Sequence, residues 1–551
     1  MRKNVLALSI AAMIGGLGFA GAASADVVVG VAPLKPTTAT TMSFAEGGVG
    51  HALLVPYFNA QNGNMTVMHV VNTDTSNGKA VKVRFRGALN SDDILDFQVF
   101  MSPGDVWTAA VTAGADGVAQ IVTADGTCTL PALAKGQNQR FVTNRLNPGI
   151  AAPDQANNTR EGYVEIFNMA DIPQQLAGGL TAVNPATGVT STANPLFTAI
   201  KHVNGVAPCT PAVLNGTLQN FTSAATVAQA GFDTPSTGLL GDWYILNVAQ
   251  TTTFSGSATA IRAENAGTQA IANFVHFPQT DSNAPTPDQY TADPLFRTLN
   301  VFTQANVAPT TVPAIAAANY DLPDMSTPYV TAPSNTAPLT QARLLTNALA
   351  VTSIANQYAN DSSISAKTDW VFSMPTRRYN VASNYAAAQT GGNAAQVRYF
   401  SDLIATGNGV NDERFNPSNT SLITTGGAIC VSSTGQAFYD REETTTTSGA
   451  VFSPGSITQT RFCGETSVLS FADAGTSVLG ASVARQNLST GAFTNGWSRV
   501  DVSNSVGGQS LGLPILGSSM IKLSNPSATA GTSGTYGITW PHRFTFPTVA
   551  P

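Results

Sequence analysis

The chain has 551 residues, of which only 11% are charged, less than half of the roughly 25% that is usual in soluble proteins. Its net charge of -6 and its lack of clustered lysine or arginine argue against nucleic acid as a partner, because nucleic-acid binding needs a concentrated positive surface. The weak charge also leaves little electrostatic repulsion to oppose self-association.

The first 25 residues have the pattern of a secretory signal peptide. Arg2 and Lys3 give a positive start, residues 5–20 form a short apolar run, and an Ala-Ser-Ala cleavage site ends at Ala25. The run is too short and too often interrupted by glycine to span a membrane, and no later stretch is long and apolar enough. We therefore predict an exported chain that begins at Asp26 and has no transmembrane segment. We expect it at the cell surface or outside the cell, with the periplasm as second choice.

The chain contains four cysteines, which in an oxidising compartment predicts two disulfides. Four cysteines allow three pairings. Sequence order favours Cys128 with Cys209 and Cys430 with Cys463, because each bond then closes a loop within one half of the chain. Each loop would contribute about 4 kcal/mol to stability in the chain-entropy model. No C-x-x-C pair occurs and the five histidines are scattered, so we predict no metal site.

Residues 64–111 show the alternation of apolar and polar side chains that half-buried strands require. In residues 80–86, apolar side chains that would face a core alternate with basic side chains that would face solvent. The apolar positions are Val81, Val83 and Phe85, and the basic positions are Lys82, Arg84 and Arg86. The Asn77-Gly78 turn before this segment predicts a hairpin. Strands at this spacing, with turns between them, predict an antiparallel β-sandwich.

Further strands are expected at residues 162–168, 242–248 and 257–262, each bounded by turn-forming residues. The N-terminal β-sandwich region would therefore occupy residues 26–280. Residues 281–340 are rich in proline, threonine and alanine, which predicts a linker or a long loop.

The C-terminal part, residues 341–551, is predicted to be β-rich with one inserted helix. Apolar residues recur there at spacings of four and three, which predicts a helix near 341–360. These residues are Leu344, Ala348, Val351, Ala355 and Tyr358. Short apolar runs at 369–372, 437–439 and 467–471 predict further strands. The fold class is thus mainly β, with antiparallel sandwich-like domains, long loops and at least one helix in the C-terminal half.

One catalytic pattern occurs, the G-x-S-x-G string at residues 508–512. A nucleophile elbow needs an acid and then a histidine later in the chain, and a helix directly after the serine. His542 is available, but no Asp or Glu follows Ser510, and Pro514 lies where the helix should begin. We predict no catalytic residue and no cofactor.

Acidic residues gather at two places in the sequence. The first group is Asp92, Asp93 and Asp96, and the second is Asp440, Glu442 and Glu443 with Arg441 among them. Carboxylates in a loop can bind a cation or act as an acid and base. We interpret both groups as solvated turns or strand ends with internal arginine–carboxylate pairing, and keep cation binding at residues 440–443 as the alternative.

We interpret His69 and most of the tryptophans as structural residues. His69 lies among apolar neighbours, which favours a hydrogen-bonded strand histidine. Most of the tryptophans would fill cores, although one or two could form a carbohydrate platform. The five are Trp107, Trp243, Trp370, Trp497 and Trp540.

Three strings, at residues 368–379, 437–443 and 462–466, resemble a group of exported proteobacterial cell-surface proteins. The resemblance, which also includes the turn region at 72–78, implies localisation and architecture, and it carries over no catalytic residue. It supports the pairing of Cys430 with Cys463, which brackets residues 440–443.

These observations predict a non-enzymatic exported protein of the bacterial cell surface, with a structural or interaction role. Self-association into a surface layer or matrix is one form of that role. The alternative is an exported carbohydrate- or surface-binding module, whose partner would be cell-surface polysaccharide. A secreted hydrolase is the second alternative.

Overall fold

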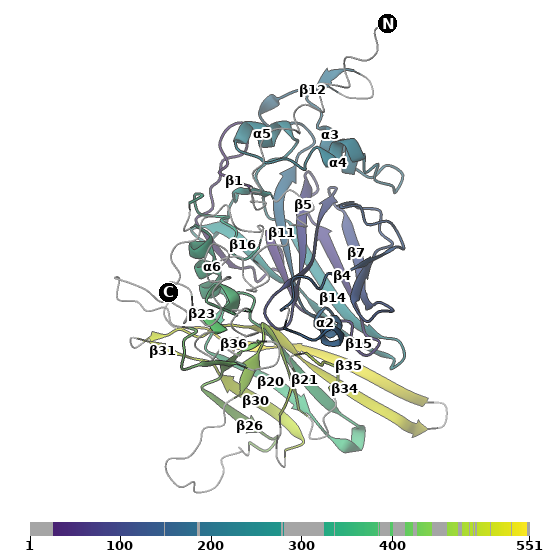
Figure 1. Cartoon of the computed structure of the whole chain (residues 1–551), viewed down its shortest axis with the longest axis vertical. Coiled ribbons are helices and arrows are strands. Elements are labelled where there is room, and N and C mark those ends of the chain that lie inside the picture. The colour runs from purple at the N-terminus through teal and green to yellow at the C-terminus, as the bar shows by residue number, and fades with distance from the viewer. Residues whose placement is uncertain are drawn as a thin grey trace.

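The structure is a computed structural model, and it describes residues 26–547 except 148, 184–187, 277–278, 280–323, 335–336, 384, 386–396, 401–413, 423–426, 444–459, 472–476, 484, 489, 491–492, 507–508 and 530–531. The described residues are mainly β, with several antiparallel sheets and few helices, which confirms the predicted fold class (Figure 1). The predicted signal peptide and most of the predicted linker lie outside the described residues.

Two antiparallel sheets pack face to face in the N-terminal half. The first contains, in spatial order, β17 (Thr268–Gln269), β16 (Thr259–Asn265), β3 (Ala52–Asn59), β11 (Glu161–Ile172), β5 (Gly78–Gly87), β6 (Asp93–Met101) and β9 (Cys128–Leu130), with β2 (Thr41–Phe44) also paired to β16. The second contains β10 (Asn138–Arg140), β8 (Ala119–Val122), β7 (Val106–Ala113), β4 (Met65–Asn72), β14 (Leu239–Asn247) and β15 (Thr252–Ser257). Between them lies a core that includes Val81, Val83, Phe85, Trp107 and Trp243, as the alternation in residues 80–86 predicted.

The turn at Asn77-Gly78 does not form the predicted hairpin. Strand β4 pairs with β7 and β14, whereas β5 pairs with β6 and β11, so the turn connects one sheet to the other. The carboxylate of Asp74 holds the connection by accepting hydrogen bonds from the backbone N–H groups of Ser76 and Asn77, at 2.8 and 3.0 Å. Both strands can then place their apolar faces in the same core.

Short helices cover one end of the first sheet. They are α3 (Pro195–Ile200), α4 (Pro211–Asn215) and α5 (Ala224–Gln229), and α2 (Ala152–Asn158) lies elsewhere, before β11. Buried side chains such as Leu196, Leu214 and Val227 pack against Phe100 of β6 and Phe274 of β18 (Phe274–His276), which pairs with β1 (Asp26–Val28). The first disulfide joins Cys128 in β9 to Cys209 before α4.

A second sandwich forms in the C-terminal half. One sheet contains β29 (Arg485–Asn487), β28 (Thr466–Ser470), β21 (Lys367–Ser373), β34 (Leu516–Thr529) and β35 (Thr532–Pro541). The other contains β26 (Gly435–Tyr439), β30 (Asn495–Asp501), β20 (Ser353–Ala359) and β36 (Arg543–Thr545). Their shared core includes Ile354, Trp370, Phe438, Phe471 and Val500. A small sheet beside them contains β24 (Thr420–Leu422), β25 (Ile429–Ser432) and β27 (Arg461–Cys463), and the second disulfide joins Cys430 of β25 to Cys463 of β27.

The inserted helix is shorter than the sequence predicts. Helix α6 (Ala337–Ala348) ends before residue 350, and the following residues form β19 (Ala350–Val351) and β20. In β20 the side chains of Ile354 and Tyr358 are buried, four residues apart. A spacing of four fits a strand as well as a helix, and pairing with β30 and β36 decides for the strand.

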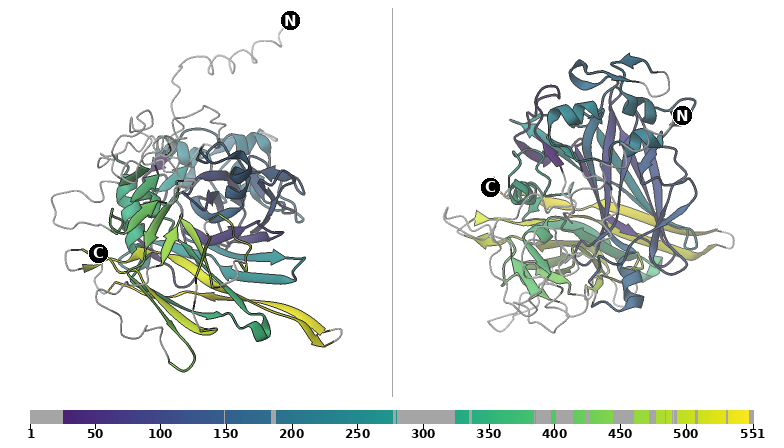
Figure 2. Two further views of the ribbon diagram at one scale, coloured as in Figure 1. Left: turned by 60° about the horizontal axis from the view of Figure 1, so that its bottom comes forward. Right: turned by 45° about the horizontal axis from the view of Figure 1, so that its top comes forward.

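The two halves share a core, and the described end of the segment predicted as a linker or long loop contributes to that core. Met325 and Tyr329 are buried, and the Tyr329 ring stacks on Phe167 of β11 at a centroid distance of 6.2 Å. The same cluster joins Met42 of β2 to Leu345 of α6. The first sheet is therefore covered on both faces, and both views in Figure 2 show the C-terminal half packed closely against the N-terminal half.

Candidate functional site

The basic side chains of β5 are buried, so the solvated basic face that the sequence predicts is wrong. Each cation has an acidic partner, and residues from further along the chain, Asp324 and Arg378, lie against Arg86 and Glu165 on this face. The pairs on this face are Lys82 with Asp96, Arg84 Nη1 with Asp93 Oδ2 at 3.0 Å, and Arg86 Nε with Glu165 Oε2 at 3.1 Å. Lys79, two residues before Val81, is also buried, and its Nζ lies 2.7 Å from Asp171 Oδ1 within the N-terminal half. Asp93 and Asp96 are therefore part of an ionic cluster and not a solvated strand end.

The C-terminal half contributes its own charges to this buried ionic cluster. Arg378, in the short helix η7 (Arg377–Tyr379), lies 3.4 Å from Glu165 Oε1 and 3.3 Å from Asp324 Oδ2 through its Nη2. Arg377 Nη2 lies 3.2 Å from Glu465 Oε1. Because Glu165 belongs to β11, the cluster links the first sheet to segments more than a hundred residues away in sequence.

Burial raises the pKa of two carboxyl groups in this region. Burial raises the pKa of Asp92 to about 7, although Tyr385 donates a hydrogen bond to Asp92 Oδ1 at 2.6 Å. Burial also raises the pKa of Glu465 to about 7, and the guanidinium groups of Arg377 and Arg378 oppose that shift. All five residues that carry or face these carboxyl groups are buried, so we interpret the region as a joint between the halves and not as a ligand site.

The acidic group at residues 440–443 forms a turn at the end of β26. Asp440 Oδ1 accepts a hydrogen bond from the Glu442 backbone N–H at 2.9 Å, and residues 441–443 are exposed. Among the described residues, no group of three or more His, Cys, Asp or Glu side chains is arranged to hold a metal ion.

The G-x-S-x-G string is only partly described, because Gly508 lies outside the described residues. Ser510 ends the two-residue strand β32 (Gln509–Ser510) and is exposed. His542 is buried, with Nδ1 2.9 Å from Asn356 Nδ2 and Nε2 3.0 Å from the Val371 carbonyl oxygen. Burial lowers the pKa of His542 to about 3. The histidine therefore has a structural place in the C-terminal core.

His69 has the role that the sequence predicts, since its Nδ1 lies 2.9 Å from Thr108 Oγ1 on the neighbouring strand. The tryptophans divide into two groups. Trp107, Trp243 and Trp370 are buried in the two cores, whereas Trp497 and Trp540 are 39% and 44% exposed. The two exposed tryptophans lie on separate surfaces of the C-terminal sandwich.

The first of these surfaces is the hairpin face, which we define as Leu523, Tyr536, Ile538 and Trp540 on strands β34 and β35. Residues 536, 538 and 540 alternate along β35, so their side chains share one face. Trp540 is paired across the sheet with Ser519 and then with Trp370, which places it at the margin of the C-terminal core. Tyr536 pairs with Leu523 beyond the end of β21 and is 65% exposed. The hairpin extends past the opposite sheet (Figures 1 and 2), which leaves this end of its apolar face uncovered.

The opposite face of the hairpin lies on β15 of the N-terminal sandwich. Thr539 Oγ1 accepts a hydrogen bond from the Ser255 backbone N–H at 3.2 Å. The approach is close enough at Gly537 that a Cβ there would lie 2.0 Å from the Thr253 carbonyl oxygen. This contact fixes the direction in which the hairpin face points.

The outer edge of β35 borders the hairpin face. In the described part of the chain, β35 pairs with β34 alone. Its ten residues include no charged side chain, and the only proline is the last residue, Pro541. Exposed edges of natural sheets usually carry lysine, proline or a bulge that blocks further pairing. The alternation of Tyr536, Ile538 and Trp540 is a sequence signal for this strand, which the strands predicted from the sequence do not include.

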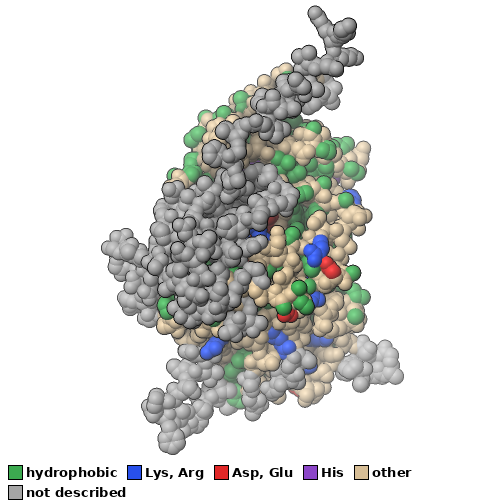
Figure 3. All heavy atoms as spheres, in the orientation of Figure 1, with side chains coloured by type: hydrophobic (Ala, Val, Ile, Leu, Met, Phe, Trp, Pro, Cys, Tyr) green, Lys and Arg blue, Asp and Glu red, His purple; other side chains and the backbone are tan. Residues whose placement is uncertain are grey.

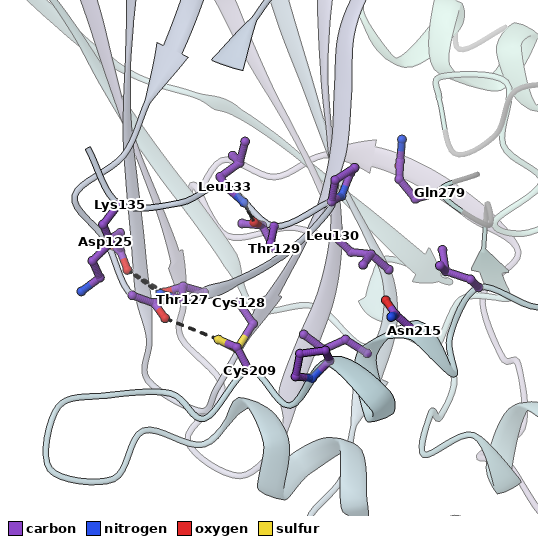
Figure 4. Close-up of a pocket in the computed structure, with 16 residues that line it drawn as sticks. Asp125, Thr127, Cys128, Thr129, Leu130, Leu133, Lys135, Cys209, Asn215 and Gln279 are labelled. Atoms are coloured by element: carbon purple, nitrogen blue, oxygen red, sulfur yellow. Dashed lines mark hydrogen bonds between the residues drawn. A yellow bond between two sulfur atoms is a disulfide. The ribbon is translucent and has the colours of Figure 1, made fainter. Parts of the chain in front are cut away.

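A pocket of about 480 Å³ lies beside the first disulfide (Figure 4). Leu130, Leu133 and Leu214 supply apolar walls between the loop at 125–135 and helix α4. The Asp125 carboxylate in its rim already accepts hydrogen bonds from the backbone N–H groups of Thr108 and Thr127, at 3.0 and 2.9 Å. The Asp125 carboxylate is therefore already engaged within the protein.

These features define a mainly β, disulfide-bonded protein whose surface carries few charges, as the described part of Figure 3 shows. The two disulfides indicate a non-cytoplasmic, oxidising compartment. None of the helices in the described ranges has the length and apolar character needed to cross a membrane. Comparison with protein-family models, with curated proteins and with solved structures finds no match.

Proposed function

We propose that this chain is a non-enzymatic, exported cell-surface protein that associates with copies of itself through the outer edge of β35. The observation that carries the proposal is that β35, which pairs with β34 alone among the described residues, has no charged side chain and lies next to the exposed apolar hairpin face. A strand edge of this kind is a template for pairing with another strand.

A second copy is the partner that fits this edge most simply. Two identical strands related by a two-fold axis pair antiparallel, and the same surface then serves both partners. Pairing would bring the Tyr536 side chains of the two copies close together and would bury apolar surface that each copy exposes alone. The net charge of -6 over the whole chain opposes this contact only weakly.

The proposal is tested by measuring the mass of the mature protein in solution over a range of concentrations, by light scattering and sedimentation. We expect a concentration-dependent dimer or larger assembly. Tyr536→Lys should shift the equilibrium toward the monomer, because two like charges would meet at the paired edge. Val203→Lys is the matched control, since Val203 is 61% exposed on the loop between α3 and α4, and it should leave the mass unchanged.

A wild-type protein that is monomeric at every concentration would overturn the proposal, and so would an assembly that Tyr536→Lys leaves intact. If the protein does self-associate, electron microscopy of concentrated protein distinguishes dimers from an ordered layer. Fractionation of cells that produce the protein tests the proposed location. An intact N-terminus in the cytoplasm would contradict it.

A further inference from the structure

The second exposed tryptophan lies on the outer face of the other C-terminal sheet. Trp497 in β30 is paired across the sheet with Tyr439 in β26 and with Gln357 in β20, so these three side chains form one row. The rings of Tyr439 and Trp497 are stacked, with centroids 4.2 Å apart and an angle of 8° between their planes. Each ring therefore restricts the orientation of the other.

The same face carries a pair of charged side chains beyond the rings. Arg499 and Asp501 follow Trp497 at intervals of two along β30, and they form an ion pair of 2.7 Å while remaining about half exposed. The alternate residues of this strand, Ser498 and Val500, point into the core. From Trp497 to Asp501 the strand covers about 13 Å, since each residue adds about 3.3 Å. We call this row and the ion pair the aromatic platform, and it comprises Tyr439, Trp497, Gln357, Arg499 and Asp501.

The chemistry of the platform fits a sugar polymer better than other ligands. The faces of pyranose rings with equatorial hydroxyl groups are lined by C–H groups, which pack on aromatic rings, while the hydroxyl groups at their rims need polar partners. Gln357 offers an amide donor and acceptor, Arg499 offers donors, and Asp501 offers acceptors. The length of the row suits a short stretch of chain rather than a single sugar.

The charges around the platform favour an uncharged polysaccharide over an acidic one. Arg499 and Asp501 neutralise each other, so the surface has no concentrated positive charge for an acidic polymer. Arg543 is exposed on β36, which lies two strands from β30, and the turn after Tyr439 adds Asp440, Arg441 and Glu442, so charges of both signs surround the rings. An uncharged polysaccharide loses no electrostatic free energy on such a surface.

We propose that the aromatic platform binds a neutral polysaccharide built of hexopyranose units with equatorial hydroxyl groups. This site is independent of the edge of β35, because it lies on the other sheet of the C-terminal sandwich. A stacked pair across two strands also stabilises a sheet by itself. The experiment must therefore separate binding from stability.

Affinity electrophoresis in native gels provides this separation. The probes are hydroxyethylcellulose, which is a neutral β-linked glucan, and carboxymethylcellulose, which has the same backbone with negative charges. We expect the neutral polymer to retard the wild-type protein and the charged polymer to retard it less. Trp497→Ala should weaken binding to the neutral polymer about tenfold or more, while Trp497→Phe should retain part of it. Unfolding midpoints of both variants show whether either has lost its fold.

Val203→Ala is the control, because it shortens an exposed apolar side chain on the loop between α3 and α4, outside both the platform and the hairpin face, and it should not change retardation. The measurement is repeated with Tyr536→Lys, so that loss of self-association and loss of sugar binding are observed separately. The proposal is overturned if the neutral polymer does not retard the wild-type protein. It is also overturned if only the charged polymer does, or if a folded Trp497→Ala variant binds as well as the wild type.

Discussion

Arg86 Nε lies 3.1 Å from Glu165 Oε2, and neither side chain exposes more than 1% of its surface. Arg86 belongs to β5 and Glu165 to the adjacent strand β11, and Arg378 from the C-terminal half contacts the same carboxylate. A charge that is removed from water is tolerated only while its partner is present, so removal of one partner costs about 3 to 5 kcal/mol. Because Glu165 contacts both Arg86 and Arg378, the folding of one half depends on the other.

The first prediction concerns the buried face of β5. Arg84→Ala should lower the free energy of unfolding by about 3 to 5 kcal/mol, because it removes a fully buried guanidinium that forms an ion pair with Asp93. Phe85→Ala on the opposite face should cost a similar amount through the cavity it creates. Arg140→Ala, in an exposed pair with Asp116, should cost less than about 1 kcal/mol. Denaturant unfolding of the mature protein measures all three, and a nearly neutral Arg84→Ala would contradict the burial of this face.

The second prediction concerns pH. Burial raises the pKa of Asp92 from 3.8 to about 7, so the folded protein binds this proton more tightly than the unfolded chain does. Its contribution to stability is complete below about pH 4 and is lost as the pH rises to about 7. Asp92→Asn should therefore remove part of the decline in stability over this range and become more stable than the wild type at pH 8. Unfolding curves at pH 5 and pH 8 test it, and parallel changes in both proteins would refute it.

The third prediction concerns the disulfides. Peptide mapping without reduction should recover Cys128 joined to Cys209 and Cys430 joined to Cys463. Replacing both members of the first pair by alanine should cost about 4 kcal/mol in the chain-entropy model, since the bond closes a loop with a sequence separation of 81 residues. Recovery of a peptide that joins Cys209 to Cys430 would show that the pairing is different.

The fourth prediction concerns the packing of the β34–β35 hairpin against β15. Gly537→Ala should destabilise the protein by about 1 to 3 kcal/mol, because the new Cβ would lie 2.0 Å from the Thr253 carbonyl oxygen and the strands would have to separate. Gly47→Ala is the control, since no atom lies within 4 Å of a Cβ at that position. Thermal unfolding compares the two, and equal midpoints would mean that β15 and β35 are not in close contact.

Local patterns were sufficient where a property depends on neighbours in sequence. The alternation of Val81, Val83 and Phe85 predicted both a strand and its core face, because side chains on a strand alternate with a period of two residues. Sequence order favoured the same disulfides that the structure contains. The chain from 350 to 359 shows the limit, since apolar residues four apart suit a helix and a strand equally, and only the pairing of β20 with β30 decides between them.

The sequence did not predict what covers the basic face of β5. The same period shows that Lys82, Arg84 and Arg86 share a face, but it does not show whether water or protein covers that face. At Arg86 and its partner Glu165, Asp324 and Arg378 provide the cover, and they lie more than two hundred residues further along the chain than Arg86. In the same way, the stack of Tyr439 on Trp497 exists only because β26 and β30 pair in one register. The sequence by itself determined which side chains share a face, because that depends on backbone period, whereas the tertiary structure decided which faces are buried, because burial depends on contacts between distant segments.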